Sequence, residues 1–141
     1  MQLFIGGACA GKQDAVNARF PGAVWSRLAP GQRLKLATRE MQPNTPLVLY
    51  GVFEWLEASL SSDSDRLRAE WQEGLQHLDE KAQAQSATLV LIMNELGRGV
   101  VPIAPNERRL CDVNGWLSQD AAALATQVFC VRHGLVHALK P

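Results

Sequence analysis

The chain has 141 residues, of which 47% are hydrophobic and 20% are charged, and its formal net charge at pH 7 is zero. These values lie close to globular averages and exclude a disordered or fibrous chain. A neutral chain argues against a nucleic-acid-binding protein, which usually needs a basic surface, and no apolar run reaches the ~18 residues of a membrane-spanning helix.

The cysteines and the first residues favour a cytoplasmic protein of one domain. Cys9, Cys111 and Cys130 form neither a CxxC pair nor an even-numbered framework, which argues against a disulfide scaffold or a zinc site. Residues 1–5 run directly into glycines without a basic start, unlike a signal peptide. Residues 1–141 match the length of one domain and contain no repeat or long linker. We therefore expect a single domain without a bound structural metal.

Strands and helices are predicted to alternate along the chain. The predicted elements are a strand at 3–5, a helix at 12–20, strands at 23–25 and 47–50, a helix at 53–60, a helix after N-cap candidates at 61–64, a strand at 88–93, a helix at 110–125, and strands at 128–131 and 135–139. The helix after 61–64 has one apolar stripe, formed by Leu67, Trp71, Leu75, Leu78 and Ala82. Residues 32–41 stay open between strand and helix, because Leu34 and Leu36 alternate while the charged residues suit a helix.

This alternation predicts βαβ units. We expect a three-layer α/β fold of the phosphate-loop type, with a mostly parallel sheet and helices on both of its faces. The last two strands, separated by Gly134, are expected to form an antiparallel hairpin.

A candidate phosphate-binding loop follows the first strand. Its residues are Gly6, Gly7, Ala8, Cys9, Ala10, Gly11, Lys12 and Gln13. They match Gly-x4-Gly-Lys-Ser/Thr at every fixed position except the last, where Gln13 replaces the hydroxyl that ligates Mg²⁺. Such a loop turns its backbone amides toward an anion at a helix N-terminus, and Lys12 would reach the β- and γ-phosphates. The alternative is a glycine turn that only tightens the packing between strand and helix. Residues 1–40 carry a net charge of +4, which suits a small anion such as a nucleotide.

A second candidate lies in residues 94–102, directly after the strand at 88–93. Loops at the carboxyl ends of parallel strands are where α/β sheets place groups that contact ligands. Glu95 is therefore a candidate catalytic acid or base, and an exposed or helix-capping carboxylate is the alternative.

These motifs resemble the adenosylcobinamide kinase/adenosylcobinamide-phosphate guanylyltransferase family of cobalamin synthesis. Residues 6–13 are similar to its Gly-Gly-x-x-Ser-Gly-Lys-Ser, and residues 94–102 match its Asn-Glu-Val-Gly-x-Gly-x-Val-Pro with one conservative change. Residues 47–60, with Trp55 and Leu56, and residues 109–140, with Asp112 and Gly115, extend the resemblance. It implies a nucleotide-binding transferase that uses ATP or GTP and adenosylcobinamide, and a homotrimer.

The departures from the family pattern concern metal binding and guanylyl transfer. Gln13 stands at the position of the magnesium-binding hydroxyl, and Tyr50 stands where the family has an acidic residue that helps to hold the metal. Mg²⁺ would thus lose both of its usual protein ligands. The family also has a histidine that accepts GMP, in a helix between the second strand and residues 47–60. The first histidine of this chain is His77, so this acceptor is missing.

Two further residues have competing interpretations. Glu54 is either a substitute carboxylate for the metal or, as we expect of a helix that starts near Val52, a residue that faces solvent. Cys9 is either a reactive thiol beside Lys12 or, as we expect, a small residue that packs in the loop.

The leading hypothesis is a shortened family member that binds GTP or ATP through residues 6–13, with Lys12 and Glu95 as the catalytic candidates. Its kinase activity is expected to be weak or lost, because positioning and charge neutralisation by the metal dominate phosphoryl transfer. Histidine-dependent guanylyl transfer is expected to be absent. The alternatives are a non-catalytic binding or assembly module and a kinase for another small substrate.

Overall fold

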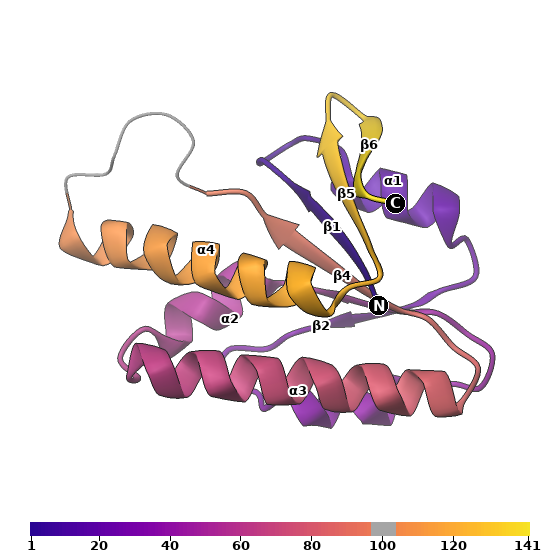
Figure 1. Ribbon diagram of the computed structural model, residues 1–141, viewed down its shortest axis with the longest axis horizontal. Coiled ribbons are helices and arrows are strands. Elements are labelled where there is room, and N and C mark those ends of the chain that lie inside the picture. Colours follow the sequence, from indigo (N-terminus) through magenta and orange to yellow (C-terminus); the bar gives the residue numbers. More distant parts are fainter. Residues whose placement is uncertain (97–103) are drawn as a thin grey trace.

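The computed structural model describes residues 1–96 and 104–141 (Figure 1). Its elements are β1 (Gln2–Gly6), α1 (Lys12–Arg19), β2 (Val24–Arg27), the 3-10 helix η1 (Leu34–Glu40), β3 (Leu47–Tyr50), α2 (Val52–Ser59), α3 (Ser64–Ala84), β4 (Leu89–Asn94), α4 (Pro105–Leu124), β5 (Gln127–Arg132) and β6 (Leu135–Lys140). Every predicted strand and helix is therefore confirmed, with boundaries shifted by a few residues.

The six strands form one sheet in the order β2-β3-β4-β1-β5-β6. The first five are parallel, and β6 returns antiparallel beside β5. The expected mostly parallel sheet with a C-terminal antiparallel hairpin is confirmed. Because β1 lies between β4 and β5, the loop after β1 emerges beside the carboxyl end of β4.

The two faces of the sheet are covered unequally. The larger core lies on the face of α2, α3, α4 and η1 and includes the whole predicted stripe of α3. Within it, the Trp71 indole Nε1 donates a hydrogen bond to the carbonyl oxygen of Leu117 at 3.0 Å, which ties α3 to α4. The opposite face is covered by α1, and its smaller core contains Phe4, Val16 and Phe129. Both faces thus carry helices, as expected (Figure 1).

The open segment 32–41 folds as the 3-10 helix η1. Leu34 and Ala37, three residues apart, are buried, whereas Leu36 is 40% exposed. Leu34 lies so close to Gly74 of α3 that a Cβ at that glycine would come 2.7 Å from its side chain. Packing against α3 therefore selects a helical spacing over the alternation of the leucines.

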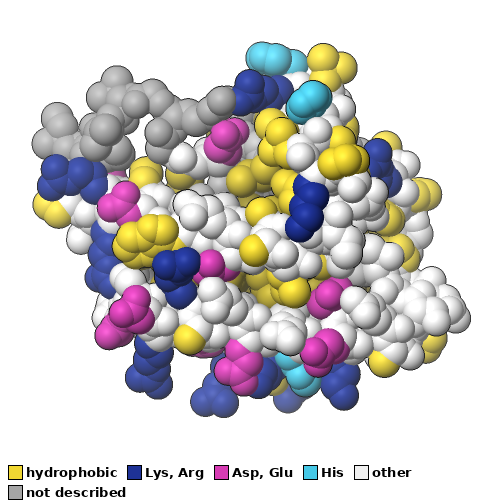
Figure 2. All heavy atoms as spheres, viewed as in Figure 1, with side chains coloured by type: hydrophobic (Ala, Val, Ile, Leu, Met, Phe, Trp, Pro, Cys, Tyr) yellow, Lys and Arg dark blue, Asp and Glu magenta, His cyan; other side chains and the backbone are white. Residues whose placement is uncertain are grey.

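Charge is segregated on the surface. Figure 2 shows acidic side chains spread along α3 and basic side chains beneath them. The outer face of α3, with Glu70, Glu73 and Glu80, is exposed as predicted. In the described part of the chain, no helix is long and apolar enough to cross a membrane.

Candidate functional site

The loop between β1 and α1 is shaped by short-range backbone contacts. The Ala10 amide donates a hydrogen bond to the Gly7 carbonyl oxygen at 3.3 Å, and the Ala10 carbonyl accepts one from the Gly134 amide at 2.9 Å. Gly11, with φ of +89°, precedes α1 as its N-cap residue. This left-handed conformation suits glycine, which has no Cβ to clash with the backbone. The loop therefore leads into the N-terminus of α1, which carries a partial positive charge.

Lys12 is the first residue of α1, and its side chain turns back over the loop. Its Nζ donates a hydrogen bond to the Gly7 carbonyl oxygen at 2.6 Å. Burial lowers the pKa of Lys12, and the neighbouring Cys9 acts in the opposite direction. A desolvated ammonium near a helix N-terminus is a strong attractor for an anion.

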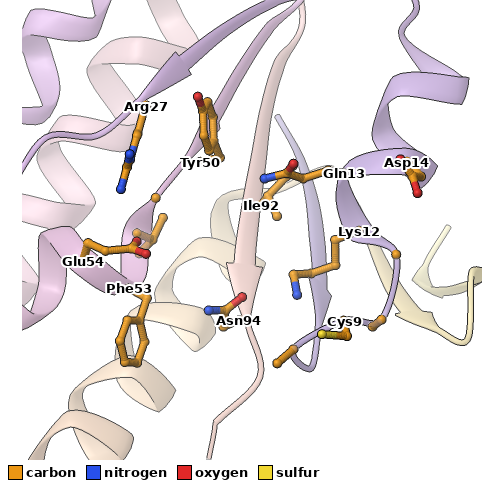
Figure 3. Close-up of a pocket in the computed structure, with 15 residues that line it drawn as sticks. Cys9, Lys12, Gln13, Asp14, Arg27, Tyr50, Phe53, Glu54, Ile92 and Asn94 are labelled. Atoms are coloured by element: carbon orange, nitrogen blue, oxygen red, sulfur yellow. The ribbon is translucent and has the colours of Figure 1, made fainter.

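A cavity of about 520 Å³ opens beside this loop. It is lined by residues 8–14, Arg27, residues 50–54, Ile92 and Asn94. These residues come from the β1–α1 loop, from the carboxyl ends of β2, β3 and β4, and from the first turn of α2 (Figure 3). The cavity thus lies at the edge of the sheet where α/β proteins place their ligands.

The wall opposite the loop is built from long side chains. Arg27 ends β2 and is paired in register with Tyr50, which ends β3. Tyr50 also contacts the Trp25 ring, with 5.8 Å between ring centroids. Gly51, with φ of +81°, is the N-cap residue of α2, so a second helix begins at this cavity. In Figure 3 the side chains of Arg27 and Glu54 extend toward the cavity from the side of β4 opposite Lys12.

The structure brings together most of the loop residues predicted from the sequence. Residues 8–13, which include Lys12, line the cavity. Gly6 and Gly7 come before them in the sequence and are not among the lining residues. Gly6 allows the chain to pack closely against β5, because a Cβ at this position would clash with the Val131 carbonyl oxygen. Tyr50, the residue at the expected acidic position, faces Gln13 across the same cavity.

From the second candidate segment, Asn94 rather than Glu95 lines the cavity. Asn94 follows Ile92 on the same face of β4, as the two-residue period of a strand requires. Glu95 is half-buried, and its amide donates a hydrogen bond to the Gly6 carbonyl oxygen at 2.8 Å. Residues 97–102 of this motif lie outside the described residues.

Cys9 and Glu54, the two residues with competing interpretations, both line the cavity. Cys9 is exposed and has a φ of +58°, so the expected packing role is wrong. Glu54 is exposed, as expected of the first turn of α2, and it also lines the cavity.

Arg27 and Phe53 are cavity residues that the sequence analysis missed. Arg27 is a charged residue at the end of a short strand, and no motif or periodicity distinguishes it from a surface charge. Phe53 lies in the predicted helix at 53–60, and the signal for its place at the cavity is its position in the first turn of a helix that follows Gly51.

The donor atoms around the loop do not fit a magnesium site of the kind that the resemblance implies. In Figure 3 the Gln13 side chain extends toward Ile92, and the Tyr50 hydroxyl points away from Lys12. Asp14 and Glu54 are the carboxylates in the described lining, and in Figure 3 the Asp14 side chain points away from the other labelled side chains, whereas Glu54 lies across β4 from the loop. Among the described residues, no three His, Cys, Asp or Glu residues are grouped to hold a metal ion. Mg²⁺ prefers carboxylate oxygens close to the phosphates that it bridges.

None of the three histidines lines the cavity. His133 and His137 are exposed on the β5–β6 hairpin, and His77 is half-buried on α3.

Comparison with known proteins supports the resemblance. No curated protein matches this chain with significant similarity. The family model described as cobinamide kinase / cobinamide phosphate guanyltransferase matches residues 13–139, which is 127 of the 141 residues. The match begins directly after Lys12, so residues 6–12 lie outside it. Since the match spans most of the chain, the protein belongs to the cobinamide kinase / cobinamide phosphate guanyltransferase family and has a related role in cobalamin biosynthesis.

Proposed function

We propose that residues 1–141 form one nucleotide-binding domain that holds the phosphates of ATP or GTP in the cavity beside the β1–α1 loop. The observation that carries this proposal is the position of Lys12. Its ammonium is partly desolvated and lies at the N-terminus of α1, on the wall of an open cavity at the carboxyl edge of the sheet. Phosphate groups bind where a helix N-terminus and a lysine act together.

Kinase activity is proposed to be weak or lost. Phosphoryl transfer depends on metal ions that bridge the β- and γ-phosphates and neutralise the developing charge. Gln13 and Tyr50 replace the hydroxyl and carboxylate that would hold such an ion, and loss of one electrostatic stabiliser commonly lowers a rate by ~10²–10³. Binding needs only Lys12 and the loop, so it survives this loss better than catalysis does.

Guanylyl transfer through a histidine is proposed to be absent. The resemblance places the GMP-accepting histidine in a helix between the second strand and residues 47–60. In this chain η1 occupies that stretch, and residues 28–46 contain no histidine.

Titration calorimetry with ATP and with GTP tests the binding proposal. Lys12→Ala is expected to weaken binding about 30-fold or more, because it removes a charged partner of the phosphates. Lys81→Ala, at an exposed lysine of α3, is the matched control and should bind as the wild type does. A wild-type protein that binds neither nucleotide, or a Lys12→Ala variant with unchanged affinity, would exclude the proposal.

Activity assays test the two catalytic statements. Mixing the protein with labelled GTP should leave no covalent GMP adduct, and turnover of adenosylcobinamide with ATP or GTP should be slow. Rapid turnover that depends on Mg²⁺ would show that other residues hold the metal, and an adduct would show that another nucleophile accepts GMP.

A non-catalytic assembly module is the second candidate, and strand β6 favours it. This strand forms one edge of the sheet, all of its residues are exposed, and Leu135 and Leu139 are 74% and 59% exposed. Exposed apolar residues on an unpaired edge are typical of a surface that meets another chain. The resemblance implies a homotrimer of this chain. Light scattering should then give a trimer mass that decreases when Leu135 and Leu139 are both changed to Ser, whereas a wild-type monomer would remove this candidate.

A further inference from the structure

Among the described residues, two basic side chains from different elements line the candidate cavity. Lys12 starts α1, and Arg27 ends β2 on the other side of β4 (Figure 3). The family pattern gave no reason to single out Arg27. Its location in the same cavity as Lys12 is a finding of the structure.

The position of Arg27 is fixed by the sheet and by the start of α2. Arg27 pairs in register with Tyr50, and the next amide, of Leu28, donates a hydrogen bond to the Tyr50 carbonyl oxygen at 2.8 Å. The Arg27 Cγ lies so close to Gly51 that a Cβ at that glycine would be 3.0 Å away. The base of the side chain is therefore held, while the residue as a whole stays exposed.

The charge of Arg27 is available to a ligand. Within residues 1–96 and 104–141, no carboxylate forms an ion pair with Arg27. Glu54 faces the same cavity and would oppose an anion, whereas Lys12 and Arg27 would attract it. A guanidinium keeps its charge at any pH at which proteins are stable, and its planar donors match two phosphate oxygens at once.

The missing metal ligands and the additional arginine are complementary. A divalent ion offsets two negative charges of a nucleoside triphosphate, and the residues near the loop do not fit such an ion. Lys12 and Arg27 together supply two positive charges that are attached to the protein. We infer that Arg27 is a phosphate-binding residue that takes over the charge neutralisation of Mg²⁺, so that this site binds a nucleoside triphosphate without a divalent metal ion. This inference rests on the proposed nucleotide site and names how that site recognises its ligand.

Calorimetry with ATP in two buffers, one with excess Mg²⁺ and one with EDTA, tests the inference. The wild-type protein should bind ATP in EDTA within threefold of its affinity in Mg²⁺, or more tightly, because free ATP carries more negative charge. Arg27→Gln should weaken binding in EDTA about 10- to 100-fold, the value of a hydrogen bond to a charged group. Arg27→Lys, which restores the charge without the planar donors, should recover part of this loss.

A matched control is Arg39→Gln, which removes an exposed arginine of η1 outside the cavity lining. It should leave the affinity in both buffers unchanged. Circular dichroism of each variant distinguishes lost binding from lost folding, and the ratio of the two affinities is a readout that a merely structural role of Arg27 would not move.

The outcomes separate this inference from the proposed function. Binding that needs Mg²⁺, or an Arg27→Gln variant that loses less than threefold in EDTA, overturns the inference and leaves the nucleotide site in place. Absence of binding in both buffers overturns the nucleotide site itself.

Glu54→Gln tests the competing view that Glu54 holds a metal. We expect it to strengthen binding in EDTA by removing a repulsive charge, and loss of an Mg²⁺-dependent gain in this variant would also overturn the inference.

Discussion

The two walls of the cavity are built in different ways. The loop wall, residues 8–14, is contiguous in the sequence and consists largely of small residues and backbone. The opposite wall joins the end of β2 to the start of α2 and presents the long side chains of Arg27, Tyr50, Phe53 and Glu54. The loop wall is therefore constrained by backbone geometry, whereas the opposite wall can change its chemistry by substitution with little change to the fold.

A helix nevertheless begins at each wall, and the backbone at the two helix starts has the same conformation. Gly11 precedes α1 with φ of +89° and ψ of 24°, and Gly51 precedes α2 with φ of +81° and ψ of 22°. Neither glycine has a side chain that could cap its helix. The N-termini of both helices thus lie at one cavity, and the walls differ in the side chains that accompany these similar backbones.

The largest expected effect concerns the end of β1, from which the chain enters the loop wall. Gly6→Ala should lower the free energy of unfolding by about 1–3 kcal/mol, because the new Cβ would overlap the Val131 carbonyl oxygen, which cannot move without disturbing β5. Gly7→Ala is the matched control, since no atom of the described residues lies within 4 Å of a Cβ at Gly7. Its effect should stay within about 0.5 kcal/mol. Urea unfolding measures both, and equal stabilities of the two variants would show that close packing against β5 does not constrain the chain where it enters the loop wall.

A smaller effect is expected when the two replaced metal ligands are restored. The double variant Gln13→Ser with Tyr50→Asp introduces one hydroxyl and one carboxylate on the two sides of the cavity. It should bind ATP about tenfold more tightly in Mg²⁺ than in EDTA, which corresponds to about 1.4 kcal/mol, whereas the wild type should show no such preference. The single variants Gln13→Ser and Tyr50→Asp are the controls, because each restores only one of the two metal ligands. Because Tyr50 contacts Trp25, thermal unfolding must show that the double variant is folded. Absence of any Mg²⁺ preference would mean that these two positions do not control metal binding here.

The strands and long helices could be predicted because their signals are local. The apolar stripe of α3 and the apolar run of β4 each indicate, from residues of one element alone, which side chains are buried. The order β2-β3-β4-β1-β5-β6 could not be predicted, because it depends on which parallel strands become neighbours far apart in the sequence. The secondary structure of residues 32–41 could not be predicted for the same reason, because η1 is held by the contact of Leu34 with Gly74 of α3, which is distant in the sequence.

The candidate site was predictable on the loop wall, and only in part on the opposite wall, where Tyr50 and Glu54 had been singled out. The loop wall follows from a motif of adjacent residues, so Lys12 and Gln13 were found directly. Asn94 could have been found by counting alternate residues from Ile92 along β4. Arg27 could not, because an arginine that ends a strand has no sequence signal until the fold places it opposite the loop.

The smallest expected effect separates the walls by their response to pH. Burial lowers the pKa of Lys12 from its ordinary value of 10.5, so Lys12 loses its proton at a lower pH than an exposed lysine does. Only the protonated form attracts phosphate. Affinity for ATP should therefore fall as the pH rises. At pH 10.5, where an ordinary lysine would be half protonated, less than half of Lys12 is protonated, so the affinity should be more than twofold lower than at neutral pH.

This pH profile must be measured where no other group of the cavity ionises. Cys9 and Tyr50 are the other lining residues with a thiol or phenol group, so the background is the double variant Cys9→Ser with Tyr50→Phe. Arg27→Gln in that background should weaken binding at every pH without changing the shape of the profile, because a guanidinium does not titrate there. The residual binding of Lys12→Ala should be independent of pH. If Arg27→Gln flattened the profile while Lys12→Ala kept it, the titrating charge would belong to the opposite wall, and the assignment of the phosphates to Lys12 would be wrong.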